Sequence, residues 1–181
     1  MVARFVALGH KAEGQQLRAA QRLCQELGLE LSVLNASMVG HELERGKVKE
    51  GLRMAPNRNL LLLSLAASYA AGLRGGPASH IALCLSQDDV NTYSSTSTAF
   101  LRHADALMAT LDPPLQLLTP LARLARWQIV KMGEQVGAPW KHTYACLEGK
   151  DVHCGKCAMC EERKDAFHRA GIEEPWGTYA A

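Results

Sequence analysis

The chain has 181 residues, with 20 Lys plus Arg against 18 Asp plus Glu, a formal net charge of +2, and six cysteines. This length gives about one domain, and the 48% hydrophobic and 21% charged fractions argue against disordered, collagen-like and coiled-coil proteins. The near-neutral charge argues against a protein that coats nucleic acid. Residues 1–8 are too short an apolar run for a signal peptide and contain Arg4. We therefore expect a cytoplasmic protein with no membrane segment.

The first part of the chain predicts a strand, a helix and a second strand. Residues 2–8 form a short apolar run that ends at Gly9, and residues 29–34 form another. Between them, apolar residues recur every three or four positions from Ala12 to Gly28. This order is typical of a βαβ unit with parallel strands.

The middle of the chain continues the alternation. Residues 37–55 are polar and contain several glycines, which predicts a surface excursion with short helical turns. Residues 59–73 are apolar on all sides but shorter than the roughly 20 residues of a membrane span, so we expect a buried helix. A strand, a polar loop, a helix and a short apolar run should follow at residues 81–85, 86–95, 96–110 and 115–118.

Two more helices are predicted towards the C-terminus. Thr119 and Pro120 are typical of a helix start, and this helix should reach Val136. The last helix should end at Gly171. The pattern indicates an α/β fold, doubly wound with a mostly parallel sheet, over residues 1–140, and a zinc-binding helical appendix over residues 141–181.

Four of the six cysteines form a cluster with the spacing C-x7-C-x2-C-x2-C: Cys146, Cys154, Cys157 and Cys160. Four thiolates match tetrahedral zinc, and gaps of two residues let successive sulfur atoms converge on one ion. Gly155 would allow the tight turn between them. Because a site closed by four cysteines leaves no position for water, we expect one structural zinc per chain. Cys24 and Cys84, alone in apolar surroundings, should be buried thiols.

Alternatives to zinc remain at this point. Iron–sulfur proteins also use C-x2-C-x2-C, but the ferredoxin form adds a fourth cysteine three residues later, which this chain lacks. Two disulfides or four unrelated thiols are the other interpretation. His142, His153 and His168 flank the cluster and are expected to be solvated or to support the ligands from outside.

The cluster and its surroundings resemble the C-terminal signature of the 7-cyano-7-deazaguanine synthases, members of the PP-loop ATP pyrophosphatase superfamily. The resemblance rests on residues 143–146, residues 154–163 with Arg163, and Ala166-Phe167. Supporting segments occur in the same order along nearly the whole chain: Gly9-His10-Lys11 with Glu13, Pro56 with Arg58-Asn59, Asp89, Tyr93, and Thr119-Pro120-Leu121. The resemblance implies an adenine nucleotide alpha hydrolase-like fold.

The resemblance also implies a reaction. The family converts 7-carboxy-7-deazaguanine, ATP and ammonia to the nitrile through an adenylated carboxylate, an amide and a second activation. By resemblance, Arg58, Asn59, Asp89 and Tyr93 are candidates for binding the deazaguanine, and Gly9 and His10 for binding the nucleotide. An Asp accepts hydrogen bonds from a guanine-like edge and a Tyr stacks on the base. Equally, Arg58 and Asn59 are candidates for capping a helix, and Asp89 for a turn.

The sequence departs from the family in two places. No Ser-Gly-Gly-x-Asp-Ser loop occurs, and the first strand resembles the family's second, so we expect the N-terminal phosphate-binding segment to be missing. The family's Tyr-Pro-Asp-Cys-Arg is replaced by residues 93–97, which read Tyr-Ser-Ser-Thr-Ser. The chain is therefore expected not to catalyse the reaction alone, and to bind ATP only if the loop is supplied.

Three functions remain open on the sequence. The first is part of a synthase, with a homodimer or a partner chain completing the sheet. The second is a non-catalytic, zinc-stabilised module that binds a purine-like ligand or a partner. The third, nucleic-acid binding through Arg123, Arg126 and Lys131, is disfavoured because these residues suit an ordinary solvated helix face.

Overall fold

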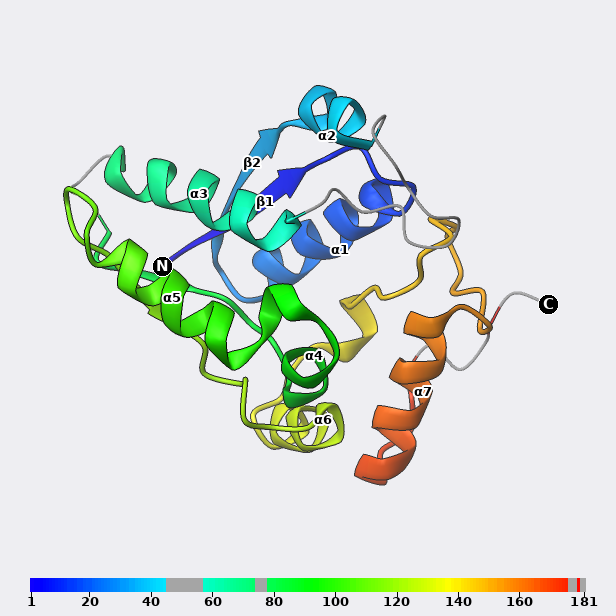
Figure 1. Cartoon of the computed structure of the whole chain (residues 1–181). Coiled ribbons are helices and arrows are strands. Elements are labelled where there is room, and N and C mark those ends of the chain that lie inside the picture. The colour runs from blue at the N-terminus through cyan, green and yellow to red at the C-terminus, as the bar shows by residue number, and fades with distance from the viewer. Residues whose placement is uncertain (45–56, 74–77, 176–178, 180–181) are drawn as a thin grey trace. The chain divides into compact units, whose positions relative to one another are not determined.

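The computed structural model describes residues 1–44, 57–73, 78–175 and 179 (Figure 1). Its contacts divide the chain into two compact units. The first unit joins residues 1–56 to residues 130–181, and the second consists of residues 57–129. A division at residue 140 stays a prediction.

The N-terminal half of the first unit is the predicted βαβ element. Figure 1 shows β1 and β2 side by side with α1 along them. The two strands are parallel, and their register pairs Val2 with Glu30 and Ala7 with Asn35. A short helix that follows β2 confirms the helical turns expected in this polar segment, whose residues 45–56 lie outside the described part. The elements are β1 (Val2–Ala7), α1 (Glu13–Glu26), β2 (Glu30–Asn35) and α2 (Ser37–Glu44).

The C-terminal half of the first unit contains a 3-10 turn, η2 (Trp140–His142), and the predicted last helix, α7 (Ala158–Ala170). Gly171 ends α7 with a φ of 69°, in the left-handed region that glycine adopts without strain. Val130, Ala166 and Phe167 form a buried cluster, which Trp140 joins with its ring edge-on to Phe167 at 5.6 Å.

In the second unit, two helices and a strand contribute to one buried cluster of apolar side chains. Its strands β3 and β4 are parallel and pair His80 with Gln116. The elements are α3 (Arg58–Ala71), β3 (His80–Ala82), α4 (Gln87–Thr92), η1 (Ser94–Thr96), α5 (Thr98–Met108) and β4 (Gln116–Leu118), followed by α6 (Arg126–Gln135), which continues into the first unit. The cluster consists of Leu63, Ala67, Ala70, Ala104, Met108, Leu115 and Leu117.

Two predictions for this region, a loop and the start of a helix, were wrong. The segment expected to be a polar loop contains α4, because Ser86 and Asp89 form a capping box in which each side chain accepts the other's backbone amide. The helix expected from Thr119 begins only at Arg126, after a turn at residues 120–124. The backbone amide of Arg126 is bonded to the Asp88 carboxylate at 2.8 Å, which caps the helix at this later position.

Two burial predictions were also wrong. The helix α3 is not buried on all sides: Leu63, Ala67 and Ala70 form its buried stripe, whereas Ser64 and Ser68 are exposed. Cys24 is buried as expected, but Cys84 is exposed. Apolar composition alone therefore did not determine which side chains this unit buries.

The four described strands form two separate parallel pairs, β1 with β2 and β3 with β4. The α/β class and the parallel strands are confirmed, whereas the single doubly wound sheet is not. Among the described residues, no helix combines the length and apolar character needed to cross a membrane.

Candidate functional site

The four clustered cysteines converge on one point. Their Sγ atoms all lie within 4.8 Å of one another, and the Sγ atoms of Cys154 and Cys160 are 4.0 Å apart. Cys146 and Cys160 are fully buried, and Cys157 is half-buried. Zn–S bonds of about 2.3 Å in a tetrahedron place sulfur atoms about 3.8 Å apart, so this arrangement fits a metal ion bound by four thiolates.

Backbone amides support the sulfur atoms. The amides of Glu148 and Cys154 each donate to the Sγ of Cys146 at 3.4 Å, and the amide of Cys157 donates to the Sγ of Cys154 at 3.3 Å. Burial raises the pKa of the Cys154 thiol, but hydrogen bonds from the backbone amides of Lys156 and Cys157 outweigh burial and lower that pKa to about 7. Such amides stabilise the thiolate form that binds metal.

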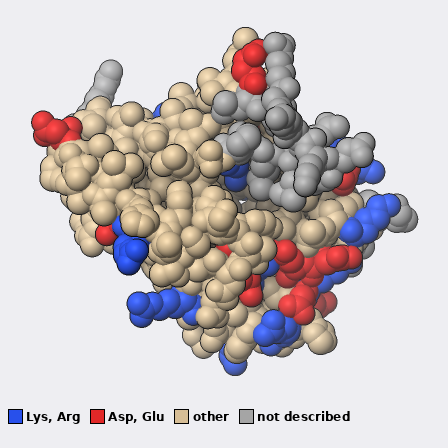
Figure 2. All heavy atoms as spheres, in the orientation of Figure 1, with Lys and Arg blue, Asp and Glu red and all other residues tan. Residues whose placement is uncertain are grey.

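Gly155 allows the turn that the cysteine spacing requires. Its φ is 72°, and a side chain there would meet Tyr179 at 2.9 Å. The ammonium of Lys164 donates to the carbonyl of Gly155 at 2.8 Å and lies 4.0 Å from the centre of the Tyr179 ring. Acidic and basic side chains lie close together over α7 (Figure 2). On this helix Arg169 lies 3.6 Å from the Asp165 carboxylate. Positive charge is thus available to offset the thiolates.

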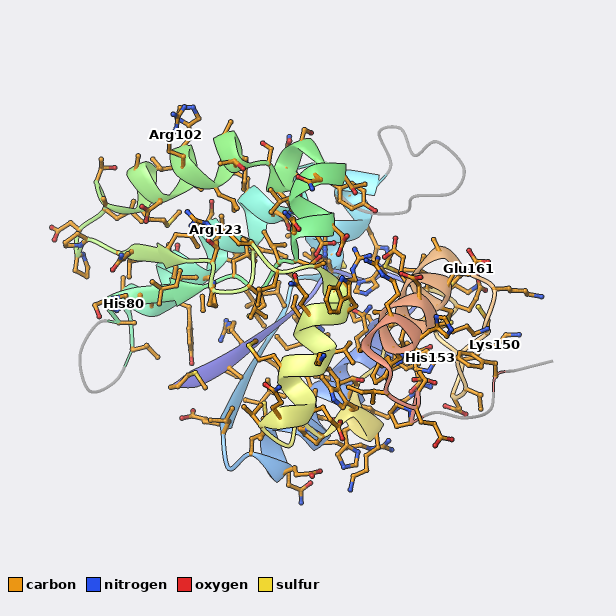
Figure 3. The ribbon with its side chains drawn as sticks, turned by 90° about the horizontal axis from the view of Figure 1, so that it is seen from below. His80, Arg102, Arg123, Lys150, His153 and Glu161 are labelled. Atoms are coloured by element: carbon orange, nitrogen blue, oxygen red, sulfur yellow. The ribbon has the colours of Figure 1, made fainter. Side chains whose placement is uncertain are left out.

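His153 lies next to the cluster but is not one of its four converging residues. Of the two expectations for this histidine, a solvated side chain or one that supports the ligands from outside, the structure favours the second. His153 is fully buried, and its Nε2 accepts the backbone amide of Ala145 at 3.0 Å. The ring stacks on Tyr144 at 4.7 Å, close to α7 (Figure 3). Burial and the nearby Arg163 lower the pKa of His153, so the neutral ring is favoured. His153 therefore supports the backbone that leads into Cys146.

Arg163 fastens α7 to the segment before the cluster. Its Nε donates to Glu174 at 2.6 Å and its Nη1 donates to the Thr143 hydroxyl at 2.7 Å. The Arg163 side chain is 8% exposed and that of Glu174 is 13% exposed. The hydroxyl of Tyr179 donates to the other oxygen of Glu174 at 2.9 Å. This network holds the helix that supplies Cys160.

The predicted nucleotide-binding residues lie in the turn between β1 and α1. Gly9 has a φ of 82°, and its amide donates to the Glu13 carboxylate at 2.6 Å. The Nδ1 of His10 lies 3.7 Å from the same carboxylate, and its Nε2 is 2.7 Å from Gln16. The turn is held together by Glu13, and whether it binds a nucleotide stays a prediction.

All four predicted substrate residues belong to the second unit. Arg58 and Asn59 begin α3, and the Nδ2 of Asn59 donates to the carbonyl of Ser95 at 3.1 Å. Burial lowers the pKa of Arg58. Tyr93 ends α4, immediately before η1, and is 37% exposed. The structure thus brings Asn59 to the segment that follows Tyr93.

Both oxygen atoms of the Asp89 carboxylate accept hydrogen bonds from other residues of the second unit. Its Oδ2 accepts the amide and the hydroxyl of Ser86, and its Oδ1 accepts from Arg126 at 2.7 Å. Burial raises the pKa of Asp89, but the Ser86 hydrogen bonds and Arg126 outweigh it, so the pKa is lowered and the carboxylate stays ionised. A role of Asp89 in binding a substrate stays a prediction.

Arg126 and Thr96 both bond to Asp89, and neither contact was predicted from the sequence. Arg126 was considered only as part of a solvated face, yet it pairs with Asp89 across 37 positions of sequence. Thr96 is buried and its hydroxyl donates to the carbonyl of Asp89 at 2.6 Å. The Ser86-x-x-Asp89 spacing was a readable capping signal, but no local pattern marks the pairing with Arg126.

Comparison with known proteins tests the resemblance. The family model described as "Queuosine biosynthesis protein QueC" matches residues 5–171. A 7-cyano-7-deazaguanine synthase of Methanoregula boonei is 29% identical over 184 residues, which cover 92% of this chain and 82% of the relative. That of Methanothermobacter thermautotrophicus is 29% identical, with 92% and 83% covered. A synthase of Saccharolobus solfataricus is 31% identical, but the match covers only 39% of it. The chain belongs to the QueC family of queuosine biosynthesis proteins.

Proposed function

We propose that the protein contributes the zinc-bound and substrate-recognising parts of a 7-cyano-7-deazaguanine synthase. In the reaction, ATP activates the carboxylate of 7-carboxy-7-deazaguanine as an adenylate, ammonia displaces AMP to give the amide, and a second activation leads to the nitrile. The observation that supports this best is the family match over residues 5–171, which includes all four clustered cysteines. The phosphate-binding loop is not among the 181 residues.

Zinc has a structural role in this proposal. One ion would be held by Cys146, Cys154, Cys157 and Cys160, whose sulfur atoms already lie within 4.8 Å of one another. A tetrathiolate ion leaves no open position, so it supplies stability and no reacting group. The chemistry is then assigned to residues outside the cluster.

The substrate residues are proposed to be Arg58, Asn59, Asp89 and Tyr93. Support comes from their common location in the second unit and from the Asn59–Ser95 hydrogen bond. Asp89 would accept from a deazaguanine edge through Oδ1, since each carboxylate oxygen takes two hydrogen bonds and Oδ2 already accepts two from Ser86. Tyr93 would stack on the base.

The nucleotide is proposed to approach the turn at Gly9 and His10. Gly9 has no side chain and a positive φ, a combination typical of places where the backbone approaches another group closely. Within the chain that group is His41, whose Nε2 would lie 2.7 Å from a Cβ at Gly9. ATP binding would still depend on a phosphate loop supplied from outside the 181 residues, by an N-terminal segment or by a second chain.

The test is to supply that loop. We expect the 181-residue protein to bind 7-carboxy-7-deazaguanine in calorimetry but to release no AMP or pyrophosphate. A fusion carrying a strand and a Ser-Gly-Gly-x-Asp-Ser loop from a relative before Met1 should release both. The control is the same fusion with the loop glycines replaced by alanine.

The outcomes separate the two remaining functions. Turnover by the unfused protein would refute the need for an added loop. Substrate binding without turnover in the fusion would favour a non-catalytic purine-binding module. Failure of both proteins to bind the deazaguanine would contradict the proposal altogether.

A further inference from the structure

The seven residues between the first two cysteines, residues 147–153, form a loop that we call the metal loop. Both ends of the metal loop are tied to the cluster, since Cys146 precedes it and Cys154 follows it. Inside it, the amide of Glu148 donates to the Sγ of Cys146. The hydroxyl of Tyr144 donates to the carbonyl of Lys150 at 2.9 Å. Its shape is therefore coupled to the metal centre.

The metal loop packs on the start of α1, about 135 positions away in sequence. Gly149 approaches so closely that a Cβ there would lie 2.3 Å from the carbonyl oxygen of Lys11 and 3.2 Å from the Cα of Ala12. Ala12 is completely buried. Gly149 also has a φ of 68°, so the contact depends on glycine in two ways.

Side chains on either side of Gly149 reinforce the contact. Glu148 accepts from the Lys11 ammonium at 2.5 Å. Asp151 accepts from the side-chain Nε2 of Gln15 at 2.5 Å and lies 3.8 Å from Arg18. These are exposed contacts that each add little stability, but together they fix the direction of the metal loop along α1.

The segment against which the metal loop packs is continuous with the turn at Gly9. Glu13, the first residue of α1, accepts the amide of Gly9 and a hydrogen bond from the Ser37 hydroxyl at 3.4 Å. Lys11 and Ala12, against which Gly149 packs, lie between Gly9 and Glu13 in the chain. A displacement of the metal loop would therefore release the turn on the side that Gly149 covers.

We propose that the metal loop is a positioning element for the turn at residues 9–13, so that metal binding at the four cysteines orders the nucleotide-side residues Gly9 and His10. The importance of that turn for the reaction rests on the proposed function, whereas the mechanical coupling does not. Zinc would then influence the proposed nucleotide-binding residues without contacting any reactant. Glu148, Gly149 and Asp151 are positioning residues in this scheme.

Amide hydrogen exchange tests the coupling in the zinc-loaded protein. Gly149→Ala should keep one zinc per chain while exchange at residues 9–18 becomes about tenfold faster or more, because the new Cβ cannot occupy its place. Gly137→Ala is the matched control: its φ is also positive, at 69°, but no atom lies within 4 Å of the added Cβ. Exchange at residues 9–18 should then change less than about threefold.

A second variant removes the side-chain contacts without straining the backbone. Glu148→Gln combined with Asp151→Asn should retain zinc and raise exchange at residues 9–18 by about threefold. Parent-like exchange in both this variant and Gly149→Ala would overturn the proposal. If Gly149→Ala fails to bind zinc, the double variant decides alone.

Removal of zinc with a chelator under reducing conditions gives a third comparison. Exchange should rise at residues 9–18 and stay constant in α5, which belongs to the second unit. An equal rise in α5 would mean general unfolding and would contradict a positioning role. No nucleotide or deazaguanine is present in these experiments, so failure of the proposed function leaves their result intact, and the reverse also holds.

Discussion

The cysteine cluster and the Asp89 network are assembled in opposite ways. All four sulfur ligands come from residues 146–160, and their convergence follows from local turns and from the N-terminal turn of α7. The Asp89 network joins α3, α4, η1 and the start of α6 through hydrogen bonds between separate segments. A local site is readable from spacing, whereas a site gathered from distant segments is defined by tertiary contacts. The same difference predicts how strongly each region responds to mutation.

The largest effect is expected at the cluster. Cys160→Ala should abolish zinc binding and lower the free energy of unfolding by at least about 4 kcal/mol, because the binding energy of a structural zinc is folding energy. Elemental analysis and urea unfolding provide the measurements. Cys84→Ala is the control, since Cys84 is exposed and outside the cluster, and should change stability by less than about 0.5 kcal/mol. Full zinc content in Cys160→Ala would refute the four-cysteine assignment.

The next largest effect is expected at the brace beside the cluster. Arg163→Met should destabilise the protein by about 3 kcal/mol, because it leaves the poorly exposed Glu174 carboxylate without its guanidinium. Arg169→Met offers a comparison on the same helix, since the Arg169–Asp165 pair is exposed and should contribute less than about 0.5 kcal/mol. Equal unfolding midpoints for the two variants in urea would show that Arg163 is not a structural brace.

A moderate, pH-dependent effect is expected at Asp89. Asp89→Asn should cost about 1 kcal/mol at pH 7, because it removes the charge that pairs with the partly exposed Arg126. The folded pKa of Asp89 is lowered, so its contribution is present above the unfolded pKa of about 3.9 and is lost as pH falls through the folded value. The stability difference between parent and variant should therefore shrink below about pH 4.

Urea titrations of parent and variant from pH 7 to pH 3 measure this difference. Loss of zinc at low pH affects both proteins, so the comparison remains valid. Asp165→Asn is the control, because its carboxylate is 63% exposed, and it should show little difference at any pH. An Asp89→Asn difference that is constant from pH 7 to pH 3 would contradict the charge-pair explanation.

The smallest effect is expected at Asn59. Asn59→Ala removes the hydrogen bond to the carbonyl of Ser95 and should lower stability by about 0.5 to 1 kcal/mol. Ser64→Ala, on the exposed side of the same helix, removes only a hydrogen bond to its own helix and should be close to neutral. If Asn59→Ala is also neutral in thermal unfolding, the Asn59–Ser95 bond does not contribute to joining α3 with η1.

Local patterns were sufficient for several elements. The βαβ unit followed from two short apolar runs around an amphipathic stretch, and the end of α7 followed from Gly171. The prediction of a loop at α4 was wrong, because this helix has only six residues and no apolar stripe, and its capping box was the only local signal of a helix. The start predicted for α6 was also wrong, because the Asp88 carboxylate from another helix decides which residue begins the helix. Caps supplied by distant residues leave no mark in the local sequence.

By itself, the sequence determined the family, the α/β class and the identity of the four cysteines, because each depends on residue types at fixed short spacings. Only the tertiary structure decided that His153 is buried, that Asp89 pairs with Arg126, and that Gly149 rests against Lys11. The last two contacts join segments separated by 37 positions or more. They form because tertiary packing brings these residues together, and no local sequence pattern indicates which distant residues will meet.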